Sequence, residues 1–368
     1  MVDPTPRSGD HAPPFQWERP LQALLDIIAC PTTGSPLRLE GDPTDGLLVS
    51  EAGTQYPIIG GIPRLLPADL LAPFLRNAYP EVLARRPALA ATLAGVPDPD
   101  PEVLDTLVSY SHQHVDLADE ERLEADWRST WDRFQPGLPP QAFADQVVLE
   151  VGSGEGRHAY LVGTHARLMV GLDLSRGVEL ARRRDGRPQT FFVQGDLRRP
   201  PFRPGAFDGL YSNGVLHHTP DPAASFRAVA PLVREGGQVS VWVYGLDEMR
   251  WTYRMSHLTW LRPFTNRLPQ QGQVAVAAGL TMAVEAGLWT PIRLLRRAGL
   301  DEMAARLPYH DAADKDWRYK LRRMFDRLNP PVTHYITHDE LLNWFSAFEA
   351  VEIINADGQG WTGRGRAR

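Results

Sequence analysis

From Val147 onward, short apolar runs alternate with stretches whose apolar positions recur at helical spacing. This alternation is typical of a parallel α/β sheet, in which each strand is followed by a helix that covers one face. The predicted strands are residues 146–151, 168–173, 190–194, 207–212 and 236–244. The predicted helices are residues 156–164, 176–184 and 222–232.

After the fifth strand the alternation stops, and residues 247–330 have the pattern of amphipathic helices, as in PIRLLRRAGL. It resumes with THDELLNWF, where Thr337 is a candidate N-cap, and with the strand VEIIN. The pattern therefore predicts one α/β domain, built from residues 136–246 and 331–368, that carries residues 247–330 as a helical insertion.

The N-terminal third has a different pattern. Residues 1–20 have no apolar segment and predict a disordered lead-in without a targeting sequence. Residues 21–68 combine one helical stretch with strand-like runs and turn glycines, so they predict a small separate unit. Residues 69–135 predict a helical linker region.

Composition narrows the class of protein. The chain has 368 residues, is 43% hydrophobic and carries a formal charge of −6, which argues against wholesale coating of nucleic acid. The single cysteine, Cys30, excludes internal disulfides and sites with several thiolates, and it fits a cytoplasmic location. The most apolar stretch, Val274–Trp289, contains Glu285 and is shorter than about 18 uncharged residues, so it predicts a buried cap helix and no membrane span.

The strongest motif is VVLEVGSGEGRH, residues 147–158, in which an apolar strand runs into three glycines and then a helix. Glycines at such a turn allow tight dihedral angles and close approach of a ligand to the backbone. The dinucleotide fingerprint G-x-G-x-x-G needs a glycine at position 157, where this chain has Arg157. This departure disfavours a dehydrogenase that uses a nicotinamide cofactor.

Polar groups follow the next three strands as well. Asp173 ends the second strand, where a carboxylate can accept both hydroxyls of a ribose. Asp196 and Leu197 follow the third strand, where an adenine can be recognised, and Asn213 ends the fourth. Carboxyl ends of parallel strands share one edge of the sheet, so these groups are expected at a single ligand site.

These motifs resemble those of class I S-adenosylmethionine-dependent methyltransferases over residues 147–245. The resemblance implies a Rossmann-like, seven-stranded sheet with the helical insertion after strand five, and S-adenosylmethionine as cofactor. It places the methionine part of the cofactor on the loop from Glu150 through Gly154, the ribose on Asp173, the adenine near Asp196, and the backbone of Asn213 beside the sulfonium. The implied cofactor-binding residues are Glu150, Gly152, Gly154, Asp173, Leu174, Asp196, Leu197 and Asn213.

Residues 21–66 are similar to the small zinc-ribbon activator proteins of tRNA and rRNA methyltransferases. Where that ribbon has its first pair of cysteines, this chain has Cys30 and Thr33, and the second pair is replaced by Val49 and Ala52. Zinc needs four ligands, so we expect a degenerate ribbon with no metal.

Methyl transfer from a sulfonium needs a general base only if the acceptor atom carries a proton. His217, His218 and Tyr244 lie near the ends of strands four and five and are the candidates for this role. The residues after strand four do not form an N-P-P-Y-type motif, which weakens the case for methylation of a nucleic-acid amino group.

The insertion carries 14 Lys and Arg against 9 Asp and Glu, together with several tryptophans and tyrosines, and it is predicted to close over the methyl group. The sequence therefore predicts an enzyme that methylates oxygen or nitrogen of a small molecule, possibly anionic or aromatic, with nucleic acid unlikely as a partner. Two alternatives stay open, an RNA methyltransferase and a noncatalytic cofactor-binding regulatory module, and the oligomeric state is not predicted.

Overall fold

A computed structural model describes residues 18–97, 99–115, 124–245, 261–328, 330–355 and 359–368. Its seven-stranded central sheet has the order β7-β6-β5-β8-β9-β11-β10. The strands are β5 (Val147–Val151), β6 (Leu168–Asp173), β7 (Thr190–Gly195), β8 (Phe207–Asn213), β9 (Val233–Tyr244), β10 (Phe348–Asn355) and β11 (Gly360–Ala367). The strands from β7 to β9 are parallel, and β11 pairs antiparallel with β9 and β10. The predicted α/β, Rossmann-like fold is confirmed.

Helices α7 (Arg157–Gly163), α8 (Gly177–Arg184) and α9 (Pro222–Val229) connect the parallel strands, and α16 (His338–Trp344) precedes β10. Strands β5 to β7 are almost wholly buried, which explains their continuous apolar runs. Thr337 is the N-cap of α16 and forms a capping box with Glu340.

The N-terminal strands extend this sheet. Strands β1 (Leu37–Glu40), β2 (Leu47–Ser50), β3 (Gln55–Ile59) and β4 (Ile62–Leu65) follow α1 (Glu18–Ile27), and β4 pairs in parallel with β7. Arg64 on β4 is buried and donates to Gln194 on β7 at 2.8 Å. The unit predicted to be separate thus shares a backbone ladder with the central sheet. Within the described residues, no group of three or more His, Cys, Asp or Glu side chains is placed to hold a metal.

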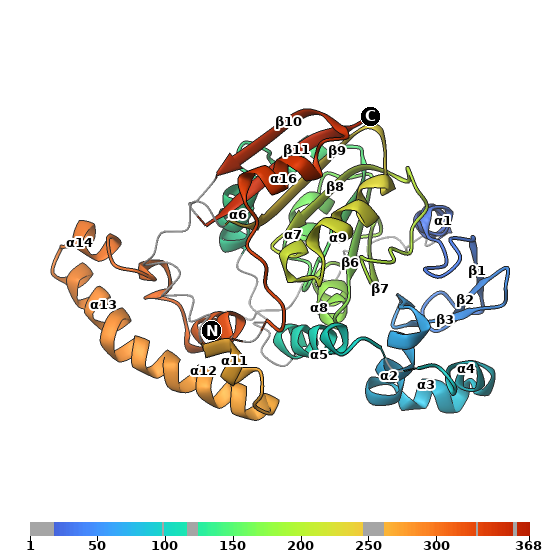
Figure 1. The fold of residues 1–368 in the computed structure, drawn as a ribbon, viewed down its shortest axis with the longest axis horizontal. Helices are drawn as coiled ribbons and strands as arrows, with labels where there is room; N and C mark the ends of the chain where they lie inside the picture. The colour runs from blue at the N-terminus through green and yellow to red at the C-terminus, as the bar shows by residue number, and fades with distance from the viewer. Residues whose placement is uncertain (1–17, 98, 116–123, 246–260, 329, 356–358) are drawn as a thin grey trace, which may run out of the picture.

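In the described part of residues 68–135 there are five helices, which are α2 (Ala68–Ala78), α3 (Pro80–Arg85), α4 (Pro87–Leu93), α5 (Pro101–Val115) and α6 (Glu124–Phe134). The first three pack with the N-terminal strands, whereas α5 and α6 lie beside the parallel strands (Figure 1). The last two helices are therefore more than a linker, because they cover one end of the sheet.

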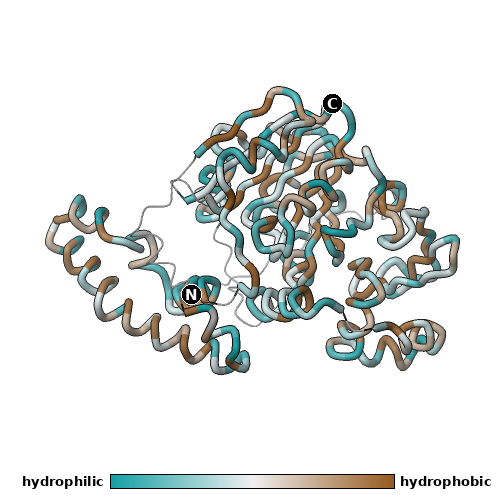
Figure 2. Tube along the Cα trace, viewed as in Figure 1, coloured by the Kyte–Doolittle hydropathy of each residue, from teal (hydrophilic) through white to brown (hydrophobic). Residues whose placement is uncertain are grey.

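The insertion contains α11 (Arg262–Thr265), α12 (Gln270–Val284), α13 (Thr290–Arg297), α14 (Asp301–Ala305) and α15 (Trp317–Leu328). A π-helical turn, Glu285–Trp289, joins α12 to α13 in one helix, Gln270–Arg297, which extends away from the sheet (Figure 1). By length and composition this helix could cross a membrane, and only 22% of its most apolar window is buried. Apolar residues recur along its whole length (Figure 2), and Met282 and Leu294 are exposed. The expectation of a buried cap helix was wrong, because the helix projects from the domain and most of its apolar window is not buried by the described residues.

Candidate functional site

One cavity of about 580 Å³ opens at the carboxyl ends of the parallel strands. We call its two sides the sheet wall, formed by the loops after β5, β6, β7 and β8, and the helical wall, formed by α5, α6 and α15. All eight predicted cofactor-binding residues line this cavity: Glu150, Gly152, Gly154, Asp173, Leu174, Asp196, Leu197 and Asn213. The volume falls within the range typical of pockets for small ligands and cofactors.

The loop after β5 needs its glycines for two different close contacts. Gly152 has φ +76°, and a Cβ there would lie 2.3 Å from a methyl carbon of Val215. Gly154 has φ +51°, and a Cβ there would lie 3.0 Å from the ring of His114 on α5. The first glycine lets the loop approach the end of β8, and the second lets the helical wall approach the loop.

Asp173 fixes this loop through hydrogen bonds. Its Oδ2 accepts from the Gly154 amide at 2.7 Å, and its Oδ1 accepts from the amide and hydroxyl of Ser175 at 2.8 and 2.6 Å. Each carboxylate oxygen can accept more than one hydrogen bond, so the contacts leave capacity for a ribose hydroxyl. Asp173 therefore has a structural role in addition to the ligand contact that the sequence suggests.

Asp196 has a different surrounding. Its carboxylate is buried and is held by Arg198, whose Nη2 lies 2.7 Å from Oδ2. Arg198 is the next residue but one in the chain, and it also lines the cavity. An adenine amino group would share this carboxylate with the guanidinium.

A second network lies behind the end of β8. The Asn213 amide accepts from Gln135 Nε2 at 2.7 Å and donates to Nδ1 of His158 at 3.1 Å. Burial, with nearby Arg157, lowers the pKa of His158 to about 3. The ring is therefore neutral, and its Nδ1 can accept the hydrogen bond from the Asn213 side chain. Burial also raises the pKa of Glu150 well above its ordinary value.

The structure separates the three predicted catalytic residues. His218 and Tyr244 line the cavity, whereas His217 is fully buried beneath them and does not line it. The Nδ1 of His217 accepts from the Tyr244 amide at 3.3 Å, and its ring centroid lies 4.0 Å from that of Tyr244. His217 therefore lies outside the cavity lining in this structure, because consecutive residues in this short turn point in different directions, and its catalytic role stays a prediction.

His218 has the orientation that a proton acceptor needs. Its Nδ1 lies 2.9 Å from the carbonyl oxygen of Val332, so Nδ1 donates and Nε2 keeps its lone pair. Burial lowers the pKa of His218 to about 4, which leaves the ring neutral at pH 7. Beside it, Tyr110 on α5 has a buried hydroxyl with no partner among the described residues.

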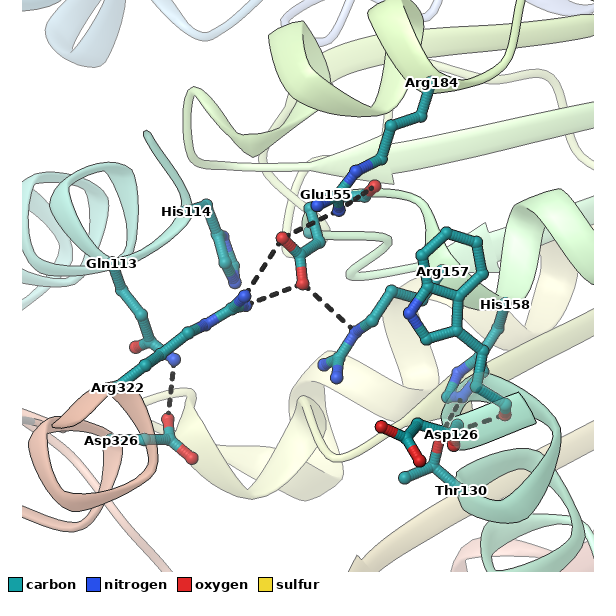
Figure 3. A network of polar contacts seen from close by, with 12 residues as sticks. Gln113, His114, Asp126, Thr130, Glu155, Arg157, His158, Arg184, Arg322 and Asp326 are labelled. Atoms are coloured by element: carbon teal, nitrogen blue, oxygen red, sulfur yellow. Dashed lines mark hydrogen bonds and ion pairs between the residues drawn. The ribbon is translucent and has the colours of Figure 1, made fainter. Parts of the chain in front are cut away.

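The helical wall supplies residues that the sequence reasoning missed, including Tyr110, His114 and Arg322. It is held to the sheet wall by ion pairs and hydrogen bonds (Figure 3). Arg322 on α15 donates to both oxygens of Glu155 at 2.7 and 3.1 Å. Within the helical wall, Gln113 on α5 donates to Asp326 on α15 at 2.9 Å. No local pattern marks these residues as neighbours of the glycine loop, because they meet it only through long-range packing.

The described part of the insertion covers less of the cavity than we expected from its prediction as a lid. Of its described helices, α15 provides most of the lining, while α12 to α14 lie farther out (Figure 1). Tyr319 lines the cavity, Trp289 is buried in a separate cluster and Trp317 is exposed. The aromatic residues at 251, 253 and 260 lie outside the described residues.

The donor set fits S-adenosylmethionine. Glu150 Oε2 and Ser153 Oγ are buried on the cavity wall with no hydrogen-bond partner among the described residues. Buried polar atoms are normally paired, so these two oxygens suit a ligand with hydrogen-bond donors, such as the amino group of a methionine moiety. The left-handed glycines leave the loop backbone accessible to such a ligand.

Comparison with known proteins identifies the domain. Residues 149–241 match the family described as methyltransferase domain. A tRNA U34 carboxymethyltransferase of Tolumonas auensis is 33% identical over 126 residues, which is 32% of this chain and 37% of that protein. Its counterpart in Mannheimia succiniciproducens is 31% identical over 126 residues, which is 32% of this chain and 38% of that protein. This chain thus spans a little over a third of the length of these curated relatives.

Solved structures include similar chains. The DhpI–SAH complex is 16% identical with a TM-score of 0.44, over 72% of this chain and 96% of that chain. An S-adenosylmethionine-dependent methyltransferase from Mesorhizobium loti is 24% identical with a TM-score of 0.30, over 32% of this chain and 53% of that chain.

The family match and the glycine loop together define an S-adenosylmethionine-dependent methyltransferase domain, which confirms the predicted enzyme class and cofactor. The predicted partners were wrong. The relatives are named as tRNA enzymes, which contradicts the prediction of a small-molecule substrate with nucleic acid an unlikely partner. The error came from the formal charge of −6, which averages over the whole chain and does not reveal the basic residues gathered around the cavity.

Proposed function

We propose that this protein transfers a methyl group from S-adenosylmethionine to a nitrogen or oxygen atom of an RNA nucleotide. The observation that carries the proposal is the charge of the cavity at the glycine loop. Eight basic and six acidic side chains line it, and burial raises the pKa of Glu150, one of the acidic residues.

This charge excess favours an anionic acceptor. S-adenosylmethionine is itself a net cation, because its sulfonium and amino group outweigh one carboxylate. A basic cavity repels a cationic cofactor, and an anionic acceptor bound beside the cofactor would offset this repulsion. A phosphodiester chain provides negative charge at every nucleotide, which fits the RNA substrates that the relatives are named for.

An aromatic surface lies where the acceptor base would enter. Tyr110, His218 and Tyr244 present three rings around one side of the cavity, with Tyr110 and His218 centroids 5.9 Å apart. An unpaired base that leaves its stack can pack on such rings, and each base–aromatic contact contributes roughly 1–3 kcal/mol.

When bound, S-adenosylmethionine supplies a methyl group on a positively charged sulfur, which leaves as a neutral thioether. The sheet wall orients the ligand through Asp173 and the glycine loop. His218 then accepts the proton of the acceptor atom at Nε2, while Val332 holds its Nδ1 proton. The helical wall limits access of water to the reacting atoms.

The test uses the full chain with S-adenosylmethionine labelled in its methyl group and total cellular RNA. We expect label in acid-precipitable material that becomes soluble with ribonuclease, and less of it as salt rises. Asp173→Ala should abolish labelling, while Asp132→Ala, an exposed change on α6, should preserve it. Ribonuclease-resistant label, or no label from a protein that binds S-adenosylhomocysteine, would reject RNA as the acceptor.

A further inference from the structure

Glu155, the residue between the last two glycines of the loop, is surrounded by three arginines (Figure 3). Its carboxylate is 3% exposed and contacts Arg322 at 2.7 Å, Arg184 at 2.8 Å and Arg157 at 3.3 Å. Burial alone would raise the pKa of Glu155, but Arg322 and Arg157 lower it strongly, so the carboxylate is ionised. One carboxylate therefore faces three guanidinium groups, which leaves an excess of positive charge in this cluster.

Arg157 differs from the other two arginines. Its side chain is 44% exposed, compared with 14% for Arg322 and 8% for Arg184. Its ion pair with Glu155 is made through Nε, and among the described residues no hydrogen bond is found from its two terminal nitrogens. Figure 3 shows these nitrogens pointing away from Glu155, into the space beside Arg322.

Among the described residues, no other carboxylate accepts a hydrogen bond from Arg157, although the charge of Asp326 acts on it from nearby. Asp126, on the opposite side of the cavity, accepts from Lys315 with both oxygens, at 2.9 and 2.7 Å. Asp326 already accepts from Gln113. Within the described part of the chain, Arg157 is therefore a cation inside the ligand cavity whose bidentate edge has no anion.

We propose that the terminal nitrogens of Arg157 bind the carboxylate of the amino-acid part of S-adenosylmethionine. A guanidinium forms two parallel hydrogen bonds with a carboxylate, and this geometry uses the edge that Arg157 leaves open. Arg157 follows the glycine loop directly, and Asp173 holds Gly154 of the same loop, so a ligand with its ribose on Asp173 lies close to Arg157. The proposal rests on the proposed function, because it takes the same cofactor.

A second consequence concerns α15. With the ligand carboxylate present, three arginines share two carboxylates, so the repulsion between Arg157 and Arg322 is reduced. Ligand binding should then strengthen the contact of α15 with the glycine loop. A ligand without the carboxylate should not have this effect.

The test is calorimetric titration of the full chain with S-adenosylhomocysteine and with its decarboxylated analogue, which keeps the amino group. Arg157→Gln should weaken binding of S-adenosylhomocysteine roughly ten- to hundredfold and leave the affinity for the analogue unchanged. Arg157→Lys should recover part of the loss. Arg183→Gln, which changes an exposed arginine on α8, should alter neither affinity.

Hydrogen exchange of α15 gives an independent readout. S-adenosylhomocysteine should slow exchange in α15 of the wild type, and this protection should shrink in Arg157→Gln. Equal weakening of both ligands by Arg157→Gln would show a structural effect and overturn the proposal, as would an unchanged affinity for S-adenosylhomocysteine. If the wild type binds neither ligand, the proposed function itself fails.

Discussion

The two walls of the cavity are built by different interactions. The sheet wall is fixed by backbone geometry and short-range hydrogen bonds, such as those from Gly154 and Ser175 to Asp173. The helical wall is held by side-chain contacts between residues far apart in the sequence, such as Arg322 with Glu155. Backbone contacts within a buried sheet open only with global unfolding, whereas side-chain contacts on separate helices can open locally.

This difference suggests a division of roles. A wall that stays fixed can keep the cofactor in register with the reacting atom. A wall that opens locally can admit a large acceptor and then exclude water. Five experiments test this comparison of the two walls. They follow in order of the expected effect, from the largest to the smallest.

Glu155→Gln should have the largest effect on folding, because Glu155 joins both walls. Removing its charge leaves three buried or half-buried arginines without their anion, which costs about 3–5 kcal/mol of unfolding free energy. Arg322→Met should cost less, since Glu155 keeps Arg184 and Arg157. Urea denaturation of both variants measures the difference, and similar losses would show that the cluster does not share one carboxylate.

Asp173→Ala should strongly weaken cofactor binding. Charge-assisted hydrogen bonds contribute roughly 1.5–3 kcal/mol each, and this change removes those that fix the loop as well as any to the ribose. Titration with S-adenosylhomocysteine gives the affinity, and Asp132→Ala is the control. Unchanged affinity in a folded variant would mean that Asp173 contacts neither loop nor ligand in solution.

Glycine substitutions should have opposite effects on stability in the glycine loop and on the projecting helix α12. Gly152→Ala places a side chain at φ +76° against Val215 and should cost at least about 1–3 kcal/mol. Gly279→Ala on α12 meets nothing within 4 Å and should stabilise the helix by up to about 1 kcal/mol. Denaturation midpoints test both, and a neutral Gly152→Ala would show that the loop relaxes easily.

The neutral histidines predict how stability depends on pH. His158 has a folded pKa of about 3, below the usual unfolded value, so its contribution is complete above about pH 6.5 and is lost as pH falls. Between pH 5 and 6.5 the unfolding free energy of the wild type should change by about 1.4 kcal/mol per pH unit more than that of His158→Gln. Parallel pH profiles would show that folding does not shift the pKa of His158.

Lys315→Met should have the smallest effect. Lys315 and Asp126 join α6 to the segment before α15, but both side chains are about one-third exposed, so the pair is worth about 0–1 kcal/mol. High salt should remove most of that difference. A loss comparable with that of Glu155→Gln would show that the helical wall is as rigid as the sheet wall.

The sequence was sufficient to predict the residues of the sheet wall, because the motifs that mark this wall are local. An apolar strand followed by glycines or by an aspartate marks the carboxyl edge of a parallel sheet within a few residues. The eight predicted cofactor-binding residues lie on one cavity because the topology brings every such edge together. Their contacts with the cofactor stay predictions.

The helical wall could not be found in the same way. The pattern of α5 shows a helix but not the element against which it packs, so Tyr110 and His114 lay in a segment taken for a linker. His217 and His218 are adjacent in sequence and equally suited to acid–base chemistry, yet only His218 lines the cavity. The direction of each ring depends on the turn after β8.

The sequence by itself determined the α/β alternation, the glycine loop and the acidic residues after β6 and β7, because strand period and turn chemistry are local properties. The tertiary structure decided that β4 joins the central sheet, that α15 contacts Glu155, and that Arg157 faces the cavity. Those features depend on which distant segments meet. A sequence pattern gives the face that an element buries, and only folding chooses the partner for that face.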